Sequence, residues 1–404
     1  MTALTKIHRR IGALFHSTLV MSALLLVPAM GQVAVSNVRA AQRPGTNLVD
    51  IDYDVTGTAK PVKVTMQASD DDGTTFSVPA TSLSGAVGGG ITPGPNLRIT
   101  WDAGTDWAGH FSTLGRFAIT ADDAEFVLIP AGSFEMGDSL GDGTSDELPV
   151  HTVQVSAFHM AKYEVTKALW DDVRTWGLIH GYTDLSVGAG KAATHPVQTI
   201  TWYDMVKWCN ARSEKEGLTP CYYTDAAQTA VFKTGPNNID NTMVKWTANG
   251  YRLPTEAEWE KAERGGLSGK RFPWGDAISH GQANFWNYGG ESYQSGSTGP
   301  HPIWSNNDDG NYPYTSPVGT FTANGYGLHD MAGNLWEWCW DWYGSYSAGL
   351  QTDPHGGVSG PNRVYRGGGW DYNAYYCRVA YRYSYDPGYS GSNFGFRIAR
   401  NSVP

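Results

Sequence analysis

The sequence has few positive charges. It carries 29 lysines and arginines against 39 aspartates and glutamates in 404 residues, which gives a formal net charge of −10. Because proteins that bind nucleic acids present clustered positive charge, this balance makes nucleic acid a poor partner. The chain also lacks an H-E-x-x-H sequence, a phosphate-binding loop and a dinucleotide fingerprint. None of the enzyme classes that carry these motifs is therefore indicated.

Cysteine is scarce as well. The four cysteines are Cys209, Cys221, Cys339 and Cys377, and no two have the C-x-x-C spacing of zinc and redox sites. Four cysteines allow three disulfide pairings. We expect two structural disulfides and prefer Cys209 with Cys221 and Cys339 with Cys377. A nucleophile or half of a metal site remains the alternative for Cys377.

The long apolar stretch of the chain lies near its start. "MTALTKIHRR" is basic, and "IGALFHSTLVMSALLLVPAM" is apolar but too short and broken for a membrane span. This pattern predicts a signal peptide over residues 1–40, cleaved after Ala40 or alternatively after Gly31. An uncleaved anchor is the other interpretation. We expect a mature chain without a membrane span, exported to the periplasm, the cell surface or the extracellular space.

Residues 45–122 have the pattern of β-structure. Val49, Ile51, Tyr53 and Val55 alternate with aspartates, and the segment "VKVTMQA" repeats this period of two. Several such short segments, separated by turns, predict an antiparallel β-sandwich of immunoglobulin or fibronectin type. We expect this domain to serve as a spacer or an adhesion module.

After residue 124 glycine, tryptophan and irregular segments dominate, and two helices are indicated. In "ITWYDMVKWCNARSEKEG", Thr201 can cap a helix together with Asp204. In "LPTEAEWEKAERGG", Thr255 and Glu258 form a capping-box sequence, and Gly265 is placed to end the helix.

Eight sequence blocks follow one another between residues 124 and 402. They read "FVLIPAGSFEMG", "DELPVHTVQVSAFHMAKYEVT", "HPVQTITWYDMVKWCN", "GYRLPTEAEWEKAERGG", "FPWGD", "NGYGLHDMAGNLWEWCWDWY", "RVYRGGGW" and "GFRIAR". In this order they resemble the sulfatase-modifying factor family, which includes the formylglycine-generating enzyme. The resemblance implies an α+β fold of the C-type-lectin kind over residues 124–402, with a small sheet, two flanking helices, much irregular loop and bound calcium.

The resemblance also implies where calcium binds. In the block "DMAGNLWEW", the side chains of Asp330 and Glu337 and the carbonyl groups of Gly333 and Leu335 match the first ion site. An all-oxygen set with a glycine at the turn suits this hard cation.

A second calcium site is implied by the same family pattern. The side chain of Asn284 and the carbonyl of Phe285 match its first half, and Asp309 and the carbonyl of Tyr312 match its second half. Asp308 competes with Asp309, because this loop is one residue longer than the pattern.

The catalytic pattern of the oxidising family members fits less well. They resemble this chain at R-G-G-S-x-x-C-x-x-x-x-C, where two cysteines bind copper(I). Here Cys377 matches the second cysteine, but Tyr372 stands at the first and Gly369 at the serine. Copper(I) favours thiolates, and a phenol does not replace one. Catalytic roles for Cys377 and for Trp336, which matches the aromatic wall of the oxygen pocket, are expected only if oxidase activity persists.

The stretch from Arg366 to Arg397 is rich in tyrosine, serine, glycine and asparagine, the composition of paratope loops. It predicts a ligand-binding surface. The candidate contact residues are Trp370, Asp371, Tyr372, Asn373, Tyr376, Tyr381, Tyr383, Tyr385 and Tyr389.

This stretch is also similar to the variable proteins of diversity-generating retroelements, in which adenine-directed copying diversifies positions on a fixed scaffold. Tyrosine, serine, aspartate and glycine can all be reached from asparagine by changing adenines only. The positions predicted as variable are those drawn from this set: Asp371, Tyr372, Asn373, Tyr376, Tyr381, Tyr383, Ser384, Tyr385, Asp386, Gly388, Tyr389, Gly391, Ser392 and Asn393. The interleaved residues predicted as scaffold are Arg378, Ala380, Arg382, Pro387, Gly395, Phe396 and Arg397. The preferred function is an exported module that binds a protein or glycan ligand. The alternative is a formylglycine-generating oxidase that modifies exported proteins.

Overall fold

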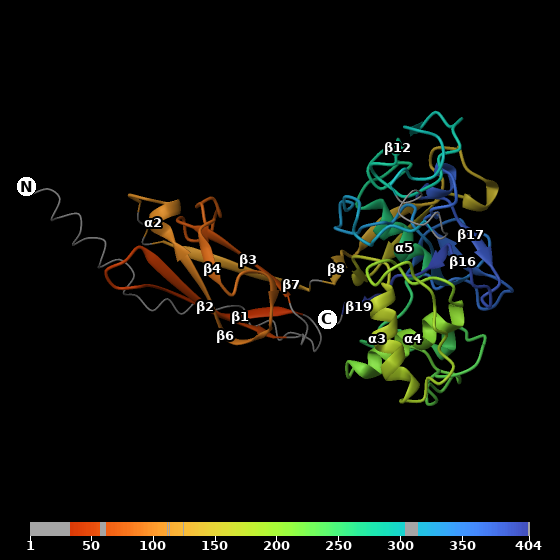
Figure 1. Cartoon of the computed structure of the whole chain (residues 1–404), viewed down its shortest axis with the longest axis horizontal. Coiled ribbons are helices and arrows are strands. Elements are labelled where there is room, and N and C mark those ends of the chain that lie inside the picture. Colours follow the sequence, from red (N-terminus) through yellow and green to blue (C-terminus); the bar gives the residue numbers. More distant parts are fainter. Residues whose placement is uncertain are drawn as a thin grey trace, which may run out of the picture. The chain divides into compact units, whose positions relative to one another are not determined.

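The computed structural model describes residues 33–56, 62–110, 112, 114–123, 125–303 and 314–402. The chain divides into two compact units, one ending at Ala124 and the other running from Glu125 to Ser402. Figure 1 shows the elements of each unit in sequence colours. Within these ranges, no helix has the length and apolarity needed to cross a membrane.

The N-terminal unit consists of two antiparallel sheets. Its elements are β1 (Ala34–Gln42), β2 (Leu48–Thr56), β3 (Val62–Ser69), β4 (Leu83–Gly85), β5 (Gly88–Ile91), β6 (Gly94–Asp102), α2 (Ala103–Asp106) and β7 (Arg116–Asp123). One sheet has the strand order β1-β2-β6-β4 and the other the order β5-β3-β7. All neighbouring strands in both sheets are antiparallel.

The alternation predicted for this unit is confirmed. Val49, Ile51, Tyr53 and Val55 of β2 are buried, whereas the aspartates between them are half-buried. β3 alternates in the same way and buries Val62, Val64, Met66 and Ala68. Side chains from both sheets form one hydrophobic core, so the period of two in the sequence accounts for which face of each strand is apolar.

The expected end of the signal peptide conflicts with β1. This strand runs from Ala34 to Gln42, and Ala40 pairs with Ile51 of β2. Cleavage after Ala40 would therefore remove most of a paired strand, and the β-unit begins before the expected residue 45. Cleavage after Gly31, the alternative site, would leave β1 whole. The rest of the predicted signal peptide, residues 1–32, lies outside the described residues.

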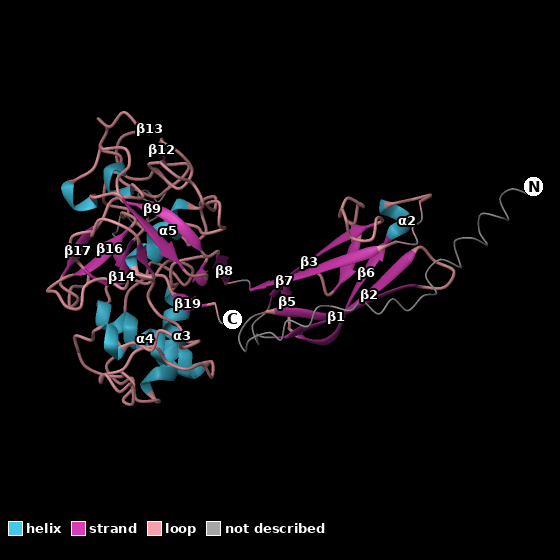
Figure 2. Cartoon of the chain, turned by 180° about the vertical axis from the view of Figure 1, so that it is seen from behind, coloured by secondary structure: helices cyan, strands magenta, loops and turns pink. Residues whose placement is uncertain are grey.

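The C-terminal unit mixes short strands with few helices. Its elements are β8 (Phe126–Ile129), β9 (Gly132–Met136), η1 (Ser145–Glu147), β10 (His151–Val155), β11 (Phe158–Ala161), α3 (Lys167–Leu178), α4 (Trp202–Lys215), η2 (Asn241–Met243), α5 (Glu256–Arg264), β12 (Ile278–Ser279), β13 (Gln294–Ser295), β14 (Trp336–Trp342), β15 (Gln351–Thr352), β16 (Arg363–Arg366), η3 (Ala374–Cys377), β17 (Tyr383–Tyr385), β18 (Phe394–Gly395) and β19 (Ala399–Asn401). Loops make up much of this unit, as Figure 2 shows. The unit is therefore of the α+β class.

Both predicted helices are present with the predicted caps. The hydroxyl of Thr201 accepts from the amide of Asp204 in a capping box at the start of α4. Thr255 and Glu258 form the same arrangement in α5, and Gly265 ends that helix in the left-handed conformation, with a φ of 58°. The sequence reasoning missed α3, which packs on α4.

The four-stranded sheet β17-β16-β14-β18 places the C-terminal part of the chain. Every residue of β14 is buried, including its four tryptophans, so this strand is a core element on both faces. Helix α5 packs against β14 and β16. Because β16 and β18 lie at the two ends of the stretch predicted to bind ligand and β17 lies within it, the sheet fixes this stretch at three separate points.

Candidate functional site

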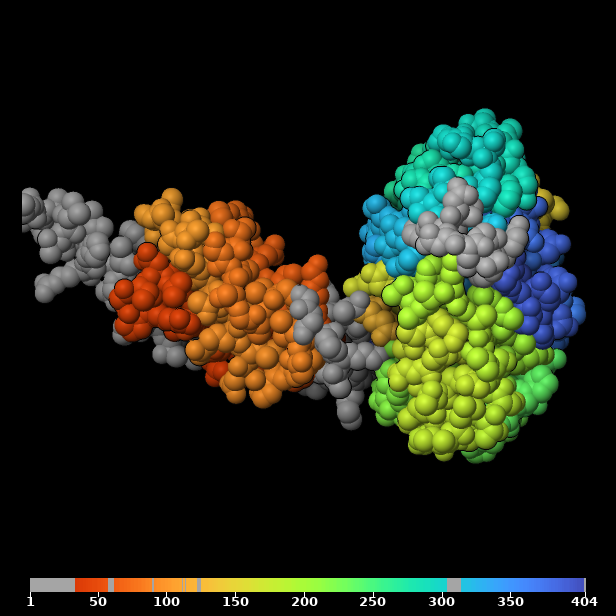
Figure 3. Space-filling model, viewed as in Figure 1, coloured from red at the N-terminus to blue at the C-terminus, as the bar shows by residue number. Residues whose placement is uncertain are grey.

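The residues 366–397 are called the C-terminal segment below. The segment begins at the end of β16, adds β17 and β18 to the sheet, and stops just before β19. In the space-filling view, residues of the C-terminal part of the chain, coloured blue, form a continuous area of the surface of the larger unit (Figure 3).

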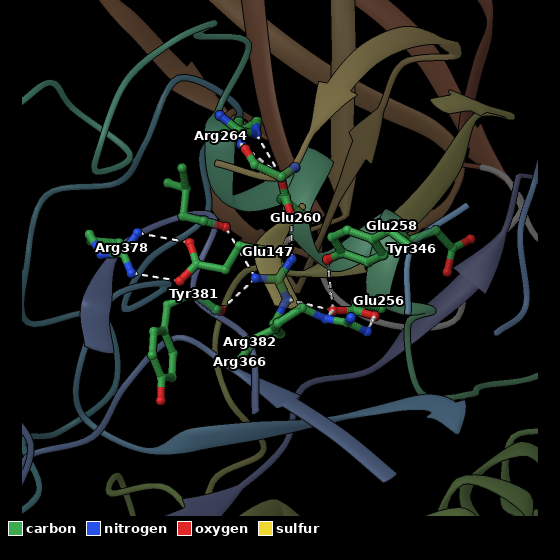
Figure 4. Close-up of polar contacts among 12 residues, drawn as sticks. Glu147, Glu256, Glu258, Glu260, Arg264, Tyr346, Arg366, Arg378, Tyr381 and Arg382 are labelled. Atoms are coloured by element: carbon green, nitrogen blue, oxygen red, sulfur yellow. Dashed lines mark hydrogen bonds and ion pairs between the residues drawn. The ribbon is translucent and has the colours of Figure 1, made fainter. Parts of the chain in front are cut away.

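Two buried ion pairs attach the segment to helix α5. Arg382 donates from Nε and Nη2 to both carboxylate oxygens of Glu256, at 2.7 and 2.6 Å. Arg366 pairs with Glu260, which also accepts from Arg264. Burial favours the neutral form of Glu260, but these two guanidinium groups hold its pKa below the ordinary value. Figure 4 shows this network.

Two further pairs attach it to other elements. Arg378 donates to both carboxylate oxygens of Glu147 in η1, at 2.8 and 2.7 Å. Arg397 donates to both oxygens of Glu337 in β14, at 2.7 and 2.6 Å. All four arginine side chains of the segment are therefore buried and paired. Arg378, Arg382 and Arg397 each bond both oxygens of one glutamate, which fixes their orientation, whereas Arg366 donates to one oxygen of Glu260.

Between these anchors the segment exposes tyrosine rings. Tyr383, Tyr385 and Tyr389 are 50%, 45% and 38% exposed. The ring centroids of Tyr385 and Tyr389 lie 4.4 Å apart. Four further candidate contact residues are half-buried. The tyrosine face, as used below, comprises Asp371, Tyr372, Asn373, Tyr376, Tyr383, Tyr385 and Tyr389.

Two of the predicted ligand contacts are instead buried. Tyr381 is only 7% exposed, and Trp370 is also buried. The ring of Tyr381 contacts Tyr376 at 4.9 Å and stacks on Tyr383 at 6.5 Å between centroids. Tyr381 therefore belongs to a floor that supports the exposed rings. The reason is packing between elements, because its ring is enclosed by those of Trp336, Tyr375 and Tyr376.

Burial separates the two classes of residue that were predicted for the segment. All residues predicted as scaffold are buried: Arg378, Ala380, Arg382, Pro387, Gly395, Phe396 and Arg397. Among the positions predicted as variable, Tyr381 and Asn393 are buried and the others are half-buried or exposed. Asn393 donates to the carboxylate of Asp371 at 3.0 Å, and burial raises the pKa of Asp371 to about 6.

The residues matched to the copper site are enclosed. Cys377 is fully buried, and burial, followed by the charge of Glu263, raises the pKa of its thiol. A Cβ at Gly368, whose φ is 78°, would lie 2.6 Å from the Cys377 sulfur, so the backbone covers this thiol closely. The ring of Tyr372 packs on Trp336 at 5.3 Å. A covered thiol, with a tyrosine instead of a second cysteine at the other matched position, fits a copper(I) site poorly, because this ion binds thiolates.

All four cysteines are free and buried, which corrects the predicted disulfides. Cys339 and Cys377 belong to separate hydrophobic clusters. Cys209 and Cys221 share one cluster, and burial raises the pKa of both thiols. The disulfides were predicted from the order of the cysteines in the sequence, which does not show that each thiol is buried in a hydrophobic cluster.

The loop matched to the first calcium site contains an unsatisfied carboxylate oxygen. Asp330 has a φ of 55°, and its Oδ1 atom is buried without a hydrogen-bond partner among the described residues. Its Oδ2 atom accepts from the amide of Gly319 at 2.6 Å. Burial raises the pKa of Asp330 to about 6. A buried lone oxygen of this kind fits a hard cation.

Glu337, the other expected carboxylate, is already engaged. It accepts from Arg397 and from the indole nitrogen of Trp259 at 2.7 Å. The sequence reasoning missed a second buried carboxylate here. Glu164 accepts from the side chain of Asn334 at 2.6 Å and from the amide of Leu335 at 3.2 Å. Burial, together with the charges of Asp330 and Glu337, raises its pKa.

The two expected calcium loops lie against each other. Asn284 and Gly333 form a β-bridge, and a Cβ at Gly333 would lie 2.3 Å from the Asn284 carbonyl. The Oδ1 atom of Asn284 is buried without a partner among the described residues, and Phe285 is buried beside it. Asp308, Asp309 and Tyr312 lie outside the described residues. Within the described ranges there is no group of three or more His, Cys, Asp or Glu side chains that could hold a metal.

The buried anchors and the exposed rings define a loop-rich α+β domain that displays a C-terminal segment. Residues 111–402 match the family model of the sulfatase-modifying factor enzyme 1-like domain, and the chain belongs to this family. The chaperone protein LppX of Paenibacillus barcinonensis is 34% identical over 298 residues, which cover 72% of this chain and 93% of that protein. The formylglycine-generating enzyme of Streptomyces coelicolor is 35% identical over 301 residues, covering 68% and 89%.

A solved structure resembles the chain as well. Treponema denticola variable protein 1 superimposes with a TM-score of 0.52 and is 28% identical, covering 70% of this chain and 96% of that chain. The proteins that this chain resembles are therefore named as an enzyme, as a chaperone and as a variable protein.

Proposed function

We propose that this protein is an exported binding module whose tyrosine face contacts a protein ligand. One observation carries the proposal: the C-terminal segment buries every residue predicted as scaffold and leaves most of its candidate contact residues exposed or half-buried. Export is supported by the signal-peptide pattern of the first 31 residues.

The physical character of the face supports this role. Exposed tyrosines gathered in one place are unusual on a monomer and mark interaction sites. Tyr383, Tyr385 and Tyr389 offer large rings with two rotatable bonds each, so ordering them on binding costs little conformational entropy. Tyrosine is also among the residues enriched at the centres of protein interfaces.

The display of random peptides tests the binding role. Peptides selected on the purified wild-type protein should lose most of their affinity for the Tyr383→Ala, Tyr385→Ala, Tyr389→Ala variant. Tyr288→Ala, at a 63% exposed tyrosine outside the segment, is the matched control. If the selected peptides bind the triple variant as well as the wild type, the tyrosine face is not the binding surface. If only glycans on an array depend on these tyrosines, the ligand class is wrong.

We further propose that the segment is diversified by a retroelement. The separation of buried fixed positions from exposed changeable ones supports this, and the variable protein from Treponema denticola is a structural relative. The test is a search of the genome for a near-copy of the DNA that encodes residues 366–397. A copy with asparagine codons at the variable positions, beside a reverse transcriptase gene, would establish diversification. A genome without such a copy leaves a binding module of fixed sequence.

The C-terminal unit is proposed to have the C-type-lectin kind of fold and to bind calcium. Asp330, with its unsatisfied oxygen, and the carbonyl groups of Gly333 and Leu335 would hold the first ion together with Glu337, and Asn284 and Phe285 would contribute to the second. The ion would neutralise buried carboxylates and join two loops.

The N-terminal unit is proposed as an immunoglobulin-like sandwich, since two antiparallel sheets share its core.

The alternative function is a formylglycine-generating oxidase, which the family relationship favours. The closed surroundings of Cys377 argue against it. Incubation with copper(I) and a cysteine-containing sulfatase peptide should leave the mass of the peptide unchanged. Conversion of the cysteine to formylglycine by the wild type, but not by Cys377→Ser, would make the protein an enzyme.

A further inference from the structure

The distribution of charge over the C-terminal segment is one-sided. Its cations are four arginines, and it contains no lysine or histidine. All four arginines are buried and paired with glutamates, so none is available to a ligand. It has two anions: Asp371 is half-buried and Asp386 is exposed. A ligand that approaches the tyrosine face therefore meets aromatic rings and carboxylates without a competing accessible cation from the segment.

A tight turn carries one of these carboxylates together with two tyrosines. The amide of Tyr389 donates to the carbonyl of Asp386 at 2.9 Å. The amide of Gly388 donates to Oδ1 of the same aspartate at 2.7 Å. Tyr385 precedes Asp386 and Tyr389 follows it three positions later, and their rings contact each other, with centroids 4.4 Å apart and planes tilted by 50°. Both rings and the aspartate are exposed.

This arrangement has the chemistry of a cation site. The faces of tyrosine rings carry partial negative charge and attract ammonium and guanidinium groups. An exposed carboxylate on the same turn adds an ionic partner with strong acceptor oxygens. Resting on the proposed binding function, we propose that Tyr385, Asp386 and Tyr389 receive an arginine or lysine side chain, so that the protein ligand is basic where it meets this turn.

Other ligands suit the turn less well. An acidic protein surface would place carboxylates against Asp386 and against the negative ring faces. A neutral glycan could stack on one ring, but it would not use the charge of Asp386. The proposal therefore commits to a basic protein segment, and glycan binding is an outcome that would overturn it.

Labelled peptides of alternating arginine and glycine, glutamate and glycine, or serine and glycine are the probes, titrated against the purified full chain. We expect binding of the arginine peptide alone, weakened about tenfold by Asp386→Asn and to a similar extent by Tyr385→Leu or Tyr389→Leu. Because a net charge of −10 attracts any cation, Asp172→Asn, at another exposed aspartate, is the matched control. Equal weakening by both aspartate variants would reduce the effect to bulk charge and overturn the proposal.

Unchanged melting temperatures will show that the variants are folded. The peptides selected on the wild-type face separate this inference from the function on which it rests. Selected peptides that depend on Tyr385 and Tyr389 and are enriched in arginine or lysine would support both. Peptides that depend on these rings without such enrichment would leave the binding function standing and overturn the basic ligand. Peptides that do not depend on the rings would overturn both.

Discussion

Arginine–carboxylate pairs occur in both units of this protein, but in opposite surroundings. In the N-terminal unit, Arg98 reaches Asp52 at 2.7 Å across two strands, with 54% and 28% of the two side chains exposed. In the C-terminal unit, Arg382 reaches Glu256 at 2.6 Å, with 2% and 5% exposed. The two contacts are alike in length and chemistry. They differ in the amount of water around them.

This difference decides what each pair does. In water, the charges of Arg98 and Asp52 are well solvated when apart, so the pair adds little to stability. The buried charges of the C-terminal unit have no such alternative, and separating one pair leaves a charge without solvent or partner. Buried pairs therefore act as fixed points for the chain, and four of them hold the segment that carries the tyrosine face.

The largest effect should come from breaking one buried pair. Arg382→Met leaves Glu256 buried without its main cation, and we expect a loss of about 3–5 kcal/mol in the free energy of unfolding. Arg98→Met in the N-terminal unit should have little effect. Urea denaturation of both variants and the wild type makes the comparison.

The double variant Arg382→Met, Glu256→Gln tests the cause of that loss. It removes the stranded charge and should recover part of the stability. If Arg382→Met and Arg98→Met denature alike, the buried pairs are not the anchors of the segment.

A second contrast lies within the segment, between a floor ring and an exposed ring. Tyr381→Ala opens a cavity under the face and should cost about 3 kcal/mol. Tyr385→Ala removes an exposed ring and should change stability by no more than about 0.5 kcal/mol, while it weakens ligand binding. Thermal melts measure both. Equal destabilisation would show that the exposed rings belong to the core.

Calcium should distinguish the two units. If the free calcium concentration is about a hundredfold above the dissociation constant of the folded C-terminal unit, removing the ion lowers the free energy of unfolding by about 2.7 kcal/mol. A chelator should therefore lower the melting temperature of the C-terminal unit only, and Asp330→Asn should remove most of this difference. An unchanged melting temperature of the wild type in chelator would show that no ion is bound.

The smallest effect concerns one buried acid. Burial, and then the charge of Glu256, raises the pKa of Asp341 to about 8. An acid whose pKa is higher in the folded state stabilises that state below its unfolded pKa, and this contribution is lost as the pH rises through about 8. In the wild type the amide of Glu256 donates to the carboxylate of Asp341 at 2.7 Å. Asp341→Asn keeps an oxygen that can accept this bond.

The Asn variant should therefore lose less stability than the wild type between about pH 6 and pH 9. Urea denaturation at both pH values measures this. Identical pH dependence in the two proteins would contradict a raised pKa at this position.

Local features were predictable because they depend on neighbours in sequence. The capping boxes at Thr201 and Thr255 and the alternation of β2 needed only residues a few positions apart. Helix α3 could have been found in the same way, from its cap Thr166 and the helical spacing of Trp170 and Val173.

The site depends on distant contacts, and these were not predictable in the same way. Arg378 and Glu147 are 231 positions apart, and nothing in either local sequence shows that they pair. The family pattern identified Arg378 as scaffold without giving its partner. The burial of Tyr381 and the covering of Cys377 likewise follow from packing between elements, which a single sequence does not reveal.

The buried arginines have a consequence for the gene. If copying errors at adenine diversify the segment, every adenine within residues 366–397 is a position of risk. Substitution of Arg366, Arg378, Arg382 or Arg397 would strand a buried glutamate and unfold many of the resulting variants. Arginine is encoded by CGC, CGG and CGT, which contain no adenine, and by CGA, AGA and AGG, which do. Selection for folding should therefore favour adenine-free codons for these four arginines. The codons of the tyrosines beside them contain adenine and remain open to change.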